Sequence, residues 1–450
     1  MPQLTEPANL PPVPFNQTGA VFVNATIRQT LQMSVGASQL RLQISNAFGL
    51  TNLPVTSVTV ALPVNNSAGI HQIQPSTLQK VTFSGSSGIS IPNGALAVSD
   101  PLNFKIKPQS ILTVTIYLAT GQTTNSITSH PGSRTTSFWQ FGNAVSASQL
   151  DITDAKTQSA AHWYFVSAVQ AWVPPAYGTL ALVGDSITDG RGSETDKNNR
   201  WPNLLFARLQ KSSRTNEIAI VNQAAGGNRV LIDGLGPNAL GRIDRDVLAH
   251  PGVKYAMIFE GVNDIGTAAT TPEAQAVVYD GLVQAYKQMV TRIHSFGIPV
   301  FGATITPFSA PSNFTGQPYS DPEREKTRQK VNKFIRESGT FDAVVSSSCT
   351  YLHAFTDMAP GGFRQDVGRS KDPESVAGGV RFRRLPAPEC EGVPASGGPV
   401  PCGYIQEVGG RCRRIHVEFS QKEEHEYAIR ICPKSHAVAL FPAISTCHAL

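Results

Sequence analysis

The amino-acid sequence predicts two folded regions of different class, an antiparallel β-sandwich followed by a three-layer α/β domain. In residues 1–172, apolar and polar residues alternate in short runs, a period of two that is typical of half-buried antiparallel strands. In residues 178–345, short apolar runs alternate with helical patterns, which indicates a parallel sheet covered by helices. Residues 346–450 show neither pattern, and all six cysteines of the chain follow residue 348, so we expect an atypical tail there.

Length and charge limit the classes of function. A chain of 450 residues is long enough for two to three domains. Its 37 basic and 32 acidic residues are scattered and give a net charge of +5, whereas a nucleic-acid partner requires clustered Lys and Arg. No run approaches the ~18 consecutive apolar residues of a membrane-spanning helix. The sequence therefore predicts neither a nucleic acid nor a membrane as partner.

The first region shows the alternation in three segments. Leu40, Leu42 and Ile44 alternate with Arg41, Gln43 and Ser45. The same period recurs in residues 58–62 and 112–118, and Asn46–Gly49 is predicted as a turn. Because no catalytic motif occurs here, we interpret the region as a structural or carbohydrate-contacting module.

The second region has readable strands and helix starts. Thr271-Pro272-Glu273 and Asp321-Pro322-Glu323 each combine an N-cap residue, a proline at the first helical position and an acid in the first turn. The patterns that follow predict two amphipathic helices, the second ending before Gly339. Four apolar runs, each followed by a polar turn, are predicted strands: residues 179–183, 217–221, 254–259 and 298–305.

Three turns after successive predicted strands carry the chemistry. The first holds Ser186, the second is the glycine-bearing stretch 222–229, and the third contains Asn263. Parallel strands end at a common sheet edge, where open α/β folds bind their ligands. A serine hydroxyl, backbone N–H groups and an amide are the parts of acyl transfer, a nucleophile with an oxyanion hole.

These turns resemble the sequence blocks of the SGNH, or GDSL-type, esterase and lipase superfamily. Gly184-Asp185-Ser186 is similar to its first block, Gly227 to the glycine of its second, and Gly261-x-Asn263-Asp264 to its third. The resemblance implies a flavodoxin-like α/β fold with Ser186 as nucleophile. It also implies that the backbone N–H groups of Ser186 and Gly227 and the side chain of Asn263 bind the oxyanion, with no cofactor and no metal. Asp185 and Asp264 are expected to brace their loops through backbone N–H groups.

Residues 1–345 are most similar to extracellular members that resemble acetylxylan esterases and carry a β-sandwich before the catalytic domain. The resemblance implies a small ester or an acylated polysaccharide as substrate, and an extracellular protein. Four N-x-S/T sequons, at Asn16, Asn24, Asn65 and Asn313, are glycan sites if the protein is secreted. The subgroup's typical stretches correspond to Asn198–Pro202, Gly226–Arg229, Arg245–Leu248 and Gly302–Pro307.

The superfamily's last block, Asp-x-x-His, is absent from residues 346–450. In the family this His is the general base that takes the serine proton, and the Asp orients its ring. The nearest match is Thr350-Tyr351-Leu352-His353, with Thr in place of Asp and too close to the preceding strand. The catalytic His and Asp are therefore not assigned. Further histidines without a motif are His416, His425, His436 and His448.

Three interpretations of the tail are open. Cys412-x-x-x-His416 and Cys432-x-x-x-His436 supply enough ligands for one tetrahedral zinc, although their spacing matches no zinc module that we can name. Disulfides would staple the tail in a secreted protein. A gene-model error near residue 346 explains together the missing block, the abrupt cysteine onset and the lost β/α pattern, and this is the interpretation that we favour. The first residues also lack the pattern of a signal peptide, which suggests a trimmed N-terminus.

Two hypotheses of function follow. In the first, the chain is a serine esterase of the SGNH type that hydrolyses short acyl esters, chiefly acetyl esters on carbohydrate, through Ser186, Gly227 and Asn263. In the alternative, it is a catalytically impaired homologue without the His–Asp pair, with at most a carbohydrate-binding role. The two hypotheses share a fold and differ in whether a histidine reaches Ser186.

Overall fold

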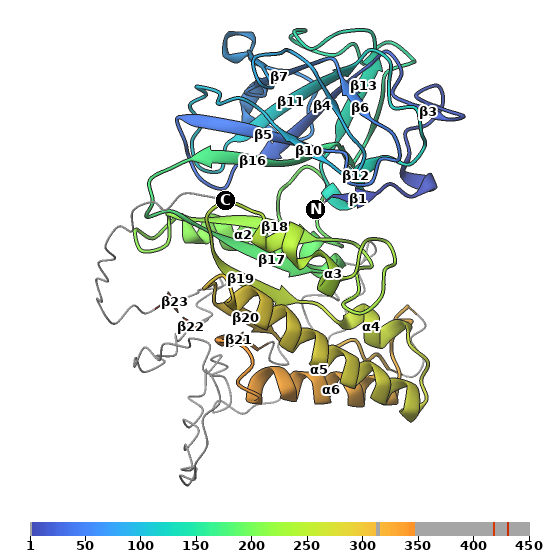
Figure 1. The fold of residues 1–450 in the computed structure, drawn as a ribbon, viewed down its shortest axis with the longest axis vertical. Helices are drawn as coiled ribbons and strands as arrows, with labels where there is room; N and C mark the ends of the chain where they lie inside the picture. Colours follow the sequence, from blue (N-terminus) through green and yellow to red (C-terminus); the bar gives the residue numbers. More distant parts are fainter. Residues whose placement is uncertain (1, 312–315, 347–416, 419–429, 432–450) are drawn as a thin grey trace, which may run out of the picture. The chain divides into compact units, whose positions relative to one another are not determined.

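The computed structural model describes residues 2–311, 316–346, 417–418 and 430–431. The chain divides into two units, Met1–Arg369 and Ser370–Leu450. In the second unit, β22 (Val417–Glu418) pairs antiparallel with β23 (Arg430–Ile431). All other described elements belong to the first unit (Figure 1). The domain boundaries at residues 172, 178 and 345 remain predictions.

A parallel sheet carries the predicted site. Its strands are β17 (Gly178–Gly184), β18 (Ile218–Ala224), β19 (Val253–Phe259), β20 (Val300–Ala303) and β21 (Ala343–Val345). Their spatial order is β18, β17, β19, β20, β21, so the first strand along the chain lies second in the sheet (Figure 1). This order is that of flavodoxin-like doubly wound folds. The predicted α/β class is therefore confirmed.

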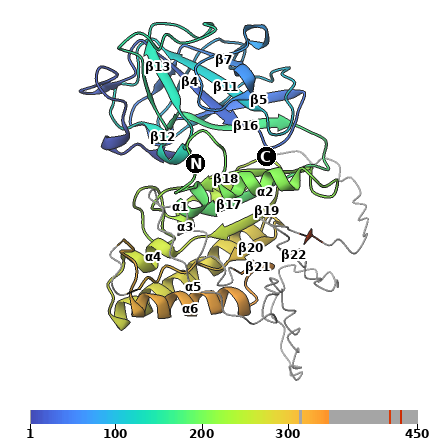
Figure 2. The same ribbon diagram turned by 180° about the vertical axis from the view of Figure 1, so that it is seen from behind.

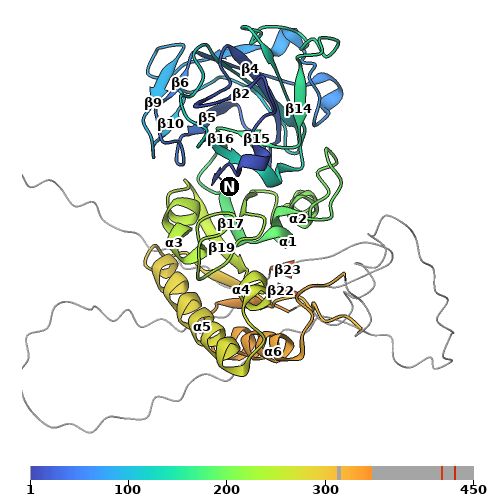
Figure 3. The same cartoon turned by 90° about the vertical axis from the view of Figure 1, so that its right-hand side faces the viewer.

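Two apolar layers cover this sheet. Ala181 and Val183 of β17 belong to a large core on one face, and Leu180 and Leu182 belong to a smaller core on the other. Both faces are buried, which is why the strands read as continuous apolar runs. Helices α3 (Ala239–Ile243), α5 (Pro272–His294) and α6 (Pro322–Glu337) contribute to the first core, and α2 (Trp201–Leu209) packs on the second. Figures 1 and 3 show α5 and α6 side by side.

The two long helices begin where the sequence predicts. The Thr271 side chain accepts a hydrogen bond from the N–H of Ala274 at 3.3 Å, and the Asp321 side chain caps α6 in the same way. Gly339, with φ of +72°, follows the end of α6. Strand β20 begins and ends two residues inside its predicted range; past its end, the backbone N–H and C=O of Ile305 bond the side chain of Asn332 on α6 instead of a neighbouring strand.

Residues 3–172 form antiparallel sheets, as predicted. The strands are β1 (Gln3–Leu4), β2 (Asn16–Gln17), β3 (Ala20–Val21), β4 (Ala25–Gln32), β5 (Gln39–Ser45), β6 (Leu53–Val55), β7 (Ser57–Ala61), β8 (Gln79–Val81), β9 (Ile89–Ile91), β10 (Leu96–Val98), β11 (Ile111–Leu118), β12 (Thr128–His130), β13 (Ser137–Phe141), β14 (Gln158–Ala160), β15 (Trp163–Tyr164) and β16 (Val166–Trp172). The largest sheet has the order β14-β13-β4-β11-β7-β8, beside the smaller sheets β10-β5-β16 and β1-β12-β15. We call residues 3–172 the antiparallel region.

The predicted half-burial is wrong for the central strand β11. Thr113 and Thr115 were expected to face solvent, yet they are 0% and 2% exposed. The guanidinium of Arg28, on the neighbouring strand β4, donates to Thr115 Oγ1 at 3.0 Å, to the carbonyl of His71 at 2.7 Å and to that of Ala147 at 2.8 Å. The loops that carry these carbonyls cover the outer face of the sheet, so both faces of β11 are buried.

Candidate active site

Three turns meet at the carboxyl edge of the parallel sheet. β17 lies between β18 and β19, and its last residue, Gly184, is in register with Ala224 and Phe259 at the ends of those strands. Because neighbouring strands lie about 4.8 Å apart, residues just past these ends are brought together. The residues predicted for the site follow within four positions of these ends: Ser186 after β17, Gly227 after β18 and Asn263 after β19.

Ser186 is the first residue of the short helix α1 (Ser186–Asp189), which β17 and its turn present at the sheet edge. The preceding Asp185 caps this helix, and its side chain accepts a hydrogen bond from the N–H of Ile187 at 2.9 Å. The expectation that Asp185 braces its turn is thus confirmed. Ser186 is half-buried whereas Asp185 is buried, so the residue that bears the hydroxyl is the accessible one of the two.

Gly227 gives the second turn a backbone that a larger residue would strain. Its φ is +68°, and a Cβ at this position would lie 2.7 Å from Cδ1 of Leu235. Within residues 2–311 and 316–346, neither the N–H of Gly227 nor that of Ser186 donates to a protein acceptor. Two backbone donors on adjacent turns are therefore available to a ligand.

Asn263 lies in helix α4 (Val262–Thr267) and its amide is held at both ends. Its Nδ2 donates to the backbone carbonyl of Asn228 at 2.7 Å, and the Tyr319 hydroxyl donates to its Oδ1 at 3.0 Å. An asparagine amide has two N–H donors, of which Asn228 takes one. We did not identify Tyr319 from the sequence, because it lies in a loop 56 residues further along the chain than Asn263.

Asp264 fastens the third turn to the second. Its carboxylate accepts hydrogen bonds from the N–H of Val230 at 2.9 and 3.1 Å and from the N–H of Leu231 at 3.0 Å. The expected bracing role of Asp264 is confirmed, and its oxygens are committed to backbone donors.

Arg242, a buried arginine of α3 that we did not identify from the sequence, joins all three turns. Its guanidinium donates to the carbonyl of Gly184 at 3.3 Å and to Oδ1 of Asn228 at 2.8 and 3.0 Å, and it lies 3.4 Å from Oε2 of Glu260. Asp246 supplies a second carboxylate at 2.9 Å. No local pattern marks Arg242, because its partners on the turns lie 14 to 58 residues away along the chain.

Burial changes the charge balance beneath the turns. It raises the pKa of Asp185 to about 7 and that of Glu260 to about 8, because desolvation disfavours the ionised carboxyl more than Arg242 favours it. Burial also raises the pKa of Tyr319, and the nearby Asp185 adds to this. The Tyr319 hydroxyl therefore keeps its proton at neutral pH and remains a donor.

A buried pair links the antiparallel region to helix α1. Nε2 of His130, at the end of β12, lies 2.8 Å from Oδ1 of Asp189, and both side chains are buried (Figure 2 shows both elements). Burial lowers the pKa of His130, and the charge of Asp189 opposes this shift. A Cβ at Gly132 would lie 1.8 Å from Asp189 Oδ2, so the backbone beside His130 leaves room for this carboxylate. We did not identify this pair from the sequence, because the two residues lie 59 positions apart.

The tail features predicted from the sequence lie outside the described residues. They are the base candidates His353, His416, His425, His436 and His448, and the cysteines of the two Cys–His pairs. Within residues 2–311 and 316–346, no group of three or more His, Cys, Asp or Glu side chains is placed to hold a metal ion. In the same part of the chain, no helix has the length and apolar character to span a membrane.

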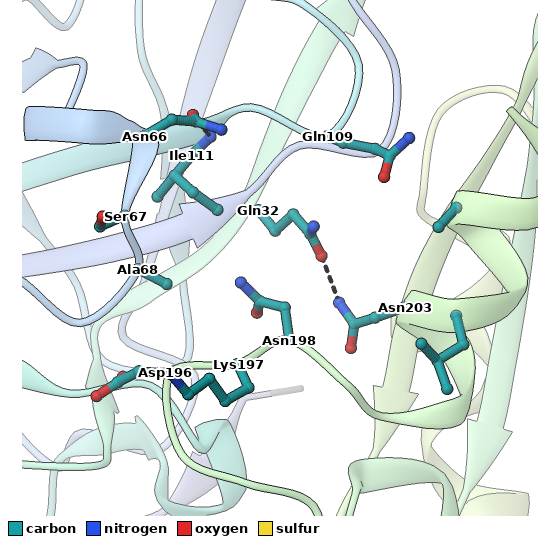
Figure 4. Close-up of a pocket in the computed structure, with 12 residues that line it drawn as sticks. Gln32, Asn66, Ser67, Ala68, Gln109, Ile111, Asp196, Lys197, Asn198 and Asn203 are labelled. Atoms are coloured by element: carbon teal, nitrogen blue, oxygen red, sulfur yellow. Dashed lines mark hydrogen bonds between the residues drawn. The ribbon is translucent and has the colours of Figure 1, made fainter.

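A separate cleft of about 610 Å³ contains none of the predicted site residues. It lies beside α2, where Asn203 Nδ2 donates to Oε1 of Gln32 on β4 at 2.6 Å (Figure 4). Five carboxamide side chains line it, those of Gln32, Asn66, Gln109, Asn198 and Asn203. The cleft is also lined by Ser67, but none of the turns that carry Ser186, Gly227 and Asn263 contributes to it, so we assign the chemistry to the sheet edge.

Residues 182–368 match the sequence model of the GDSL-like lipase/acylhydrolase family. The match extends past Val345, where we expected the resemblance to end. No relative is found among curated proteins.

Several solved structures are similar to part of the chain. The acetyl xylan esterase AlAXEase has a TM-score of 0.29 at 17% identity and covers 37% of this chain and 76% of its own. Est24, a carbohydrate acetylesterase from Sinorhizobium meliloti, has a TM-score of 0.29 at 18% identity and covers 38% of this chain and 83% of its own. A catalytic mutant of Axe2, an acetylxylan esterase from Geobacillus stearothermophilus, has a TM-score of 0.28 at 22% identity and covers 37% of this chain and 75% of its own. With TM-scores below 0.5, these likenesses support no conclusion about the substrate.

Proposed function

We propose that Ser186 is the nucleophile of an esterase site, in a chain whose residues 182–368 match the GDSL-like lipase/acylhydrolase family. The observation that carries the proposal is the placement of Ser186, Gly227 and Asn263 after three adjacent, in-register strands. Within the described residues, the N–H groups of Ser186 and Gly227 have no protein acceptor, as oxyanion donors require.

In the proposed reaction, Ser186 Oγ attacks the ester carbonyl and forms a tetrahedral intermediate. The N–H groups of Ser186 and Gly227 and the second N–H of Asn263 Nδ2 bind its oxyanion. Collapse of the intermediate breaks the bond to the alcohol, which leaves with a proton, and an acyl group stays on Ser186. Water then attacks this acyl-enzyme and releases the acid, so the serine is restored.

A proton acceptor for Ser186 is required in the first step and a proton donor in the second. In the family this group is a histidine, and His353 lies inside the matched residues 182–368. We keep His353 as a candidate on that ground alone, since it lies outside the described residues.

We propose acetyl esters of carbohydrate as the substrate class and an extracellular location. The support is the sequence resemblance to extracellular esterases that carry a β-sandwich. We also interpret the antiparallel region as that sandwich, because apolar residues of its six-stranded sheet, such as Ile27, share one core with residues of the sheet β10-β5-β16, such as Leu42.

The second candidate function is a catalytically impaired homologue with at most a carbohydrate-binding role. The observation that favours it is the absence of Asp-x-x-His from residues 346–450. Without its histidine, a serine triad loses about 10⁶ in turnover and retains only what the oxyanion hole and binding supply.

Acetate release from p-nitrophenyl acetate and from acetylated xylan by the full chain tests the proposal. Ser186→Ala should lower the rate to the level of buffer. Ser193→Ala is the matched control, because it removes a hydroxyl from the loop after α1 that donates only to the Gly190 carbonyl at 2.6 Å. Equal rates from the wild type and Ser186→Ala would reject the esterase proposal and favour the impaired homologue.

A further inference from the structure

We propose that Tyr319 is a positioning residue that aims the Asn263 amide at the oxyanion. The inference rests on the proposed role of Asn263 and extends it to a residue of the loop after β20. The Tyr319 hydroxyl donates to Asn263 Oδ1 at 3.0 Å, while the opposite end of the amide donates to the carbonyl of Asn228 at 2.7 Å.

These two contacts fix the one torsion on which an oxyanion donor depends. The terminal torsion of an asparagine side chain is broad and roughly two-fold, so a single contact leaves the amide free to rock. A donor stabilises a developing oxyanion most when it is already oriented before the reaction. With Oδ1 held by Tyr319 and one N–H of Nδ2 held by Asn228, the second N–H keeps a fixed direction.

Tyr319 is itself held in place from three sides. Gly266 lies one helical turn after Asn263 on the same face of α4, and a Cβ there would lie 2.2 Å from the Tyr319 ring. The ring of Phe308 packs edge-on at 6.3 Å. Arg324 of α6 donates to the carbonyls of Pro318 at 3.2 Å and Ala268 at 2.7 Å, which fastens the residue before Tyr319 to the end of α4.

The partner of the Tyr319 hydroxyl distinguishes it from a structural tyrosine. Tyr286, which is buried nearby, donates to the backbone carbonyl of Glu260 at 2.7 Å and so stabilises the backbone of the turn after β19. Tyr319 is only half-buried and donates to a side chain that has a proposed catalytic role. The Tyr319 ring can lie this close to α4 only because residue 266 has no Cβ, so the proposed role of Tyr319 depends on Gly266.

Two variants separate this role from general stability. Tyr319→Phe removes the hydroxyl and keeps the ring, and Gly266→Ala displaces the ring without altering either partner. The matched control is Tyr255→Phe, whose ring stacks on Phe301 at 5.9 Å on the strands of the sheet. We expect both variants to lower kcat on p-nitrophenyl acetate about tenfold, less than the 10²–10³ that follows complete loss of a donor, with KM unchanged. Tyr255→Phe should match the wild type.

A double-mutant cycle tests whether Tyr319 acts through Asn263. In the Asn263→Ala background, Tyr319→Phe should have no further effect on kcat. A tenfold loss that persists in that background, or a Tyr319→Phe rate equal to that of Tyr255→Phe, would overturn the proposal.

The inference remains testable if the esterase proposal fails. That failure is recognised by equal rates from the wild type and Ser186→Ala. The side-chain amide signals of Asn263 are then compared by NMR with asparagine labelled by ¹⁵N, using Asn263→Ala to identify them. Tyr319→Phe should shift these signals and speed their exchange with solvent, whereas Tyr255→Phe should not. Unchanged signals in Tyr319→Phe would overturn the positioning role.

Discussion

The antiparallel region and the α/β region each bury an arginine, and they use it differently. Arg28 of β4 is 0% exposed and donates to a hydroxyl and to backbone carbonyls, all neutral. Arg242 of α3 is 2% exposed and pairs with the carboxylates of Asp246 and Glu260. The first arginine holds loops over a sheet, and the second holds together the turns of the proposed site.

The different partners of the two arginines give the two regions different responses to pH. Neutral acceptors satisfy the donors of Arg28, but they leave its charge buried, which lowers its pKa to about 10. Beneath the site, the pKa of Asp246 is lowered, but burial raises the pKa of Glu260, which lies beside Arg242, to about 8 and that of Asp185 to about 7, so the net charge there depends on pH in the neutral range. The scaffold is therefore expected to be insensitive to neutral pH, and the site to respond to it.

The largest expected effect in this comparison comes from removing each arginine. Arg242→Met leaves Glu260 without its cation and leaves Asp246 with Arg245 alone, so it should cost about 3–5 kcal/mol of unfolding free energy. Arg28→Met leaves neutral acceptors unpaired but also removes a buried charge, so about 1–3 kcal/mol is expected. Urea unfolding measures both.

The esterase rate per folded molecule then distinguishes the role of Arg242 from that of Arg28. Arg242→Met should lower it, because three turns lose their common donor, while Arg28→Met should leave it at the wild-type value. An equal rate loss in both variants would contradict the distinction between scaffold and site.

Replacing either of two glycines with similar backbone torsions by alanine should have a smaller effect on stability. Gly227 has φ of +68° with Leu235 Cδ1 2.7 Å from an added Cβ, whereas Gly142 has φ of +81° and no atom within 4 Å. Alanine at either position should cost about 1–2 kcal/mol of backbone strain. Only Gly227→Ala should also shift the turn that bears an oxyanion donor and slow acetate release, by about tenfold or more.

Rates and unfolding curves of the two alanine variants provide the check. If Gly142→Ala slowed the reaction as much as Gly227→Ala, the rate loss would reflect strain alone and not the position of the donor.

The smallest expected effect is a pH slope of stability. The pKa of Glu260 is raised to about 8, so its contribution is fully present below its unfolded pKa near 4.5 and is lost as pH rises through 8. Unfolding free energy should therefore fall as pH rises from about 4.5 to 8, by at most about 1.4 kcal/mol per unit for one proton, and level off above pH 8. The lowered pKa of Arg28 acts above this window, because its contribution is lost as pH falls through about 10.

Glu260→Gln tests this assignment. Urea unfolding of this variant between about pH 5 and 8 should show a flatter dependence than the wild type, and Arg28→Met should keep the wild-type slope. A wild-type slope in Glu260→Gln would place the titration on another group.

The features predicted correctly from the sequence depend on residues that are close together along the chain. The caps at Thr271 and Asp321 and the strand that precedes Ser186 rest on neighbouring residues, and the structure confirms them. Strand order brought Ser186, Gly227 and Asn263 together because parallel strands share an edge.

What the sequence missed depends on contacts between distant segments. Arg242 reaches Gly184 across 58 residues, Tyr319 reaches Asn263 across 56, and His130 reaches Asp189 across 59. Each of these side chains alone is an ordinary polar residue in the sequence. The burial of Thr113 was missed for the same reason, since loops remote in the chain cover its face of the sheet.

The proposed function requires that Ser186 forms a covalent bond with the acyl group of the substrate. The most direct measurement is mass spectrometry of peptides after the full chain is mixed with p-nitrophenyl acetate and quenched in acid within one turnover. We expect one acetyl group on the peptide that contains Ser186, and none in Ser186→Ala. Acetate release that continues without this modification, or an acetyl group that appears on another residue at the same rate, would contradict it.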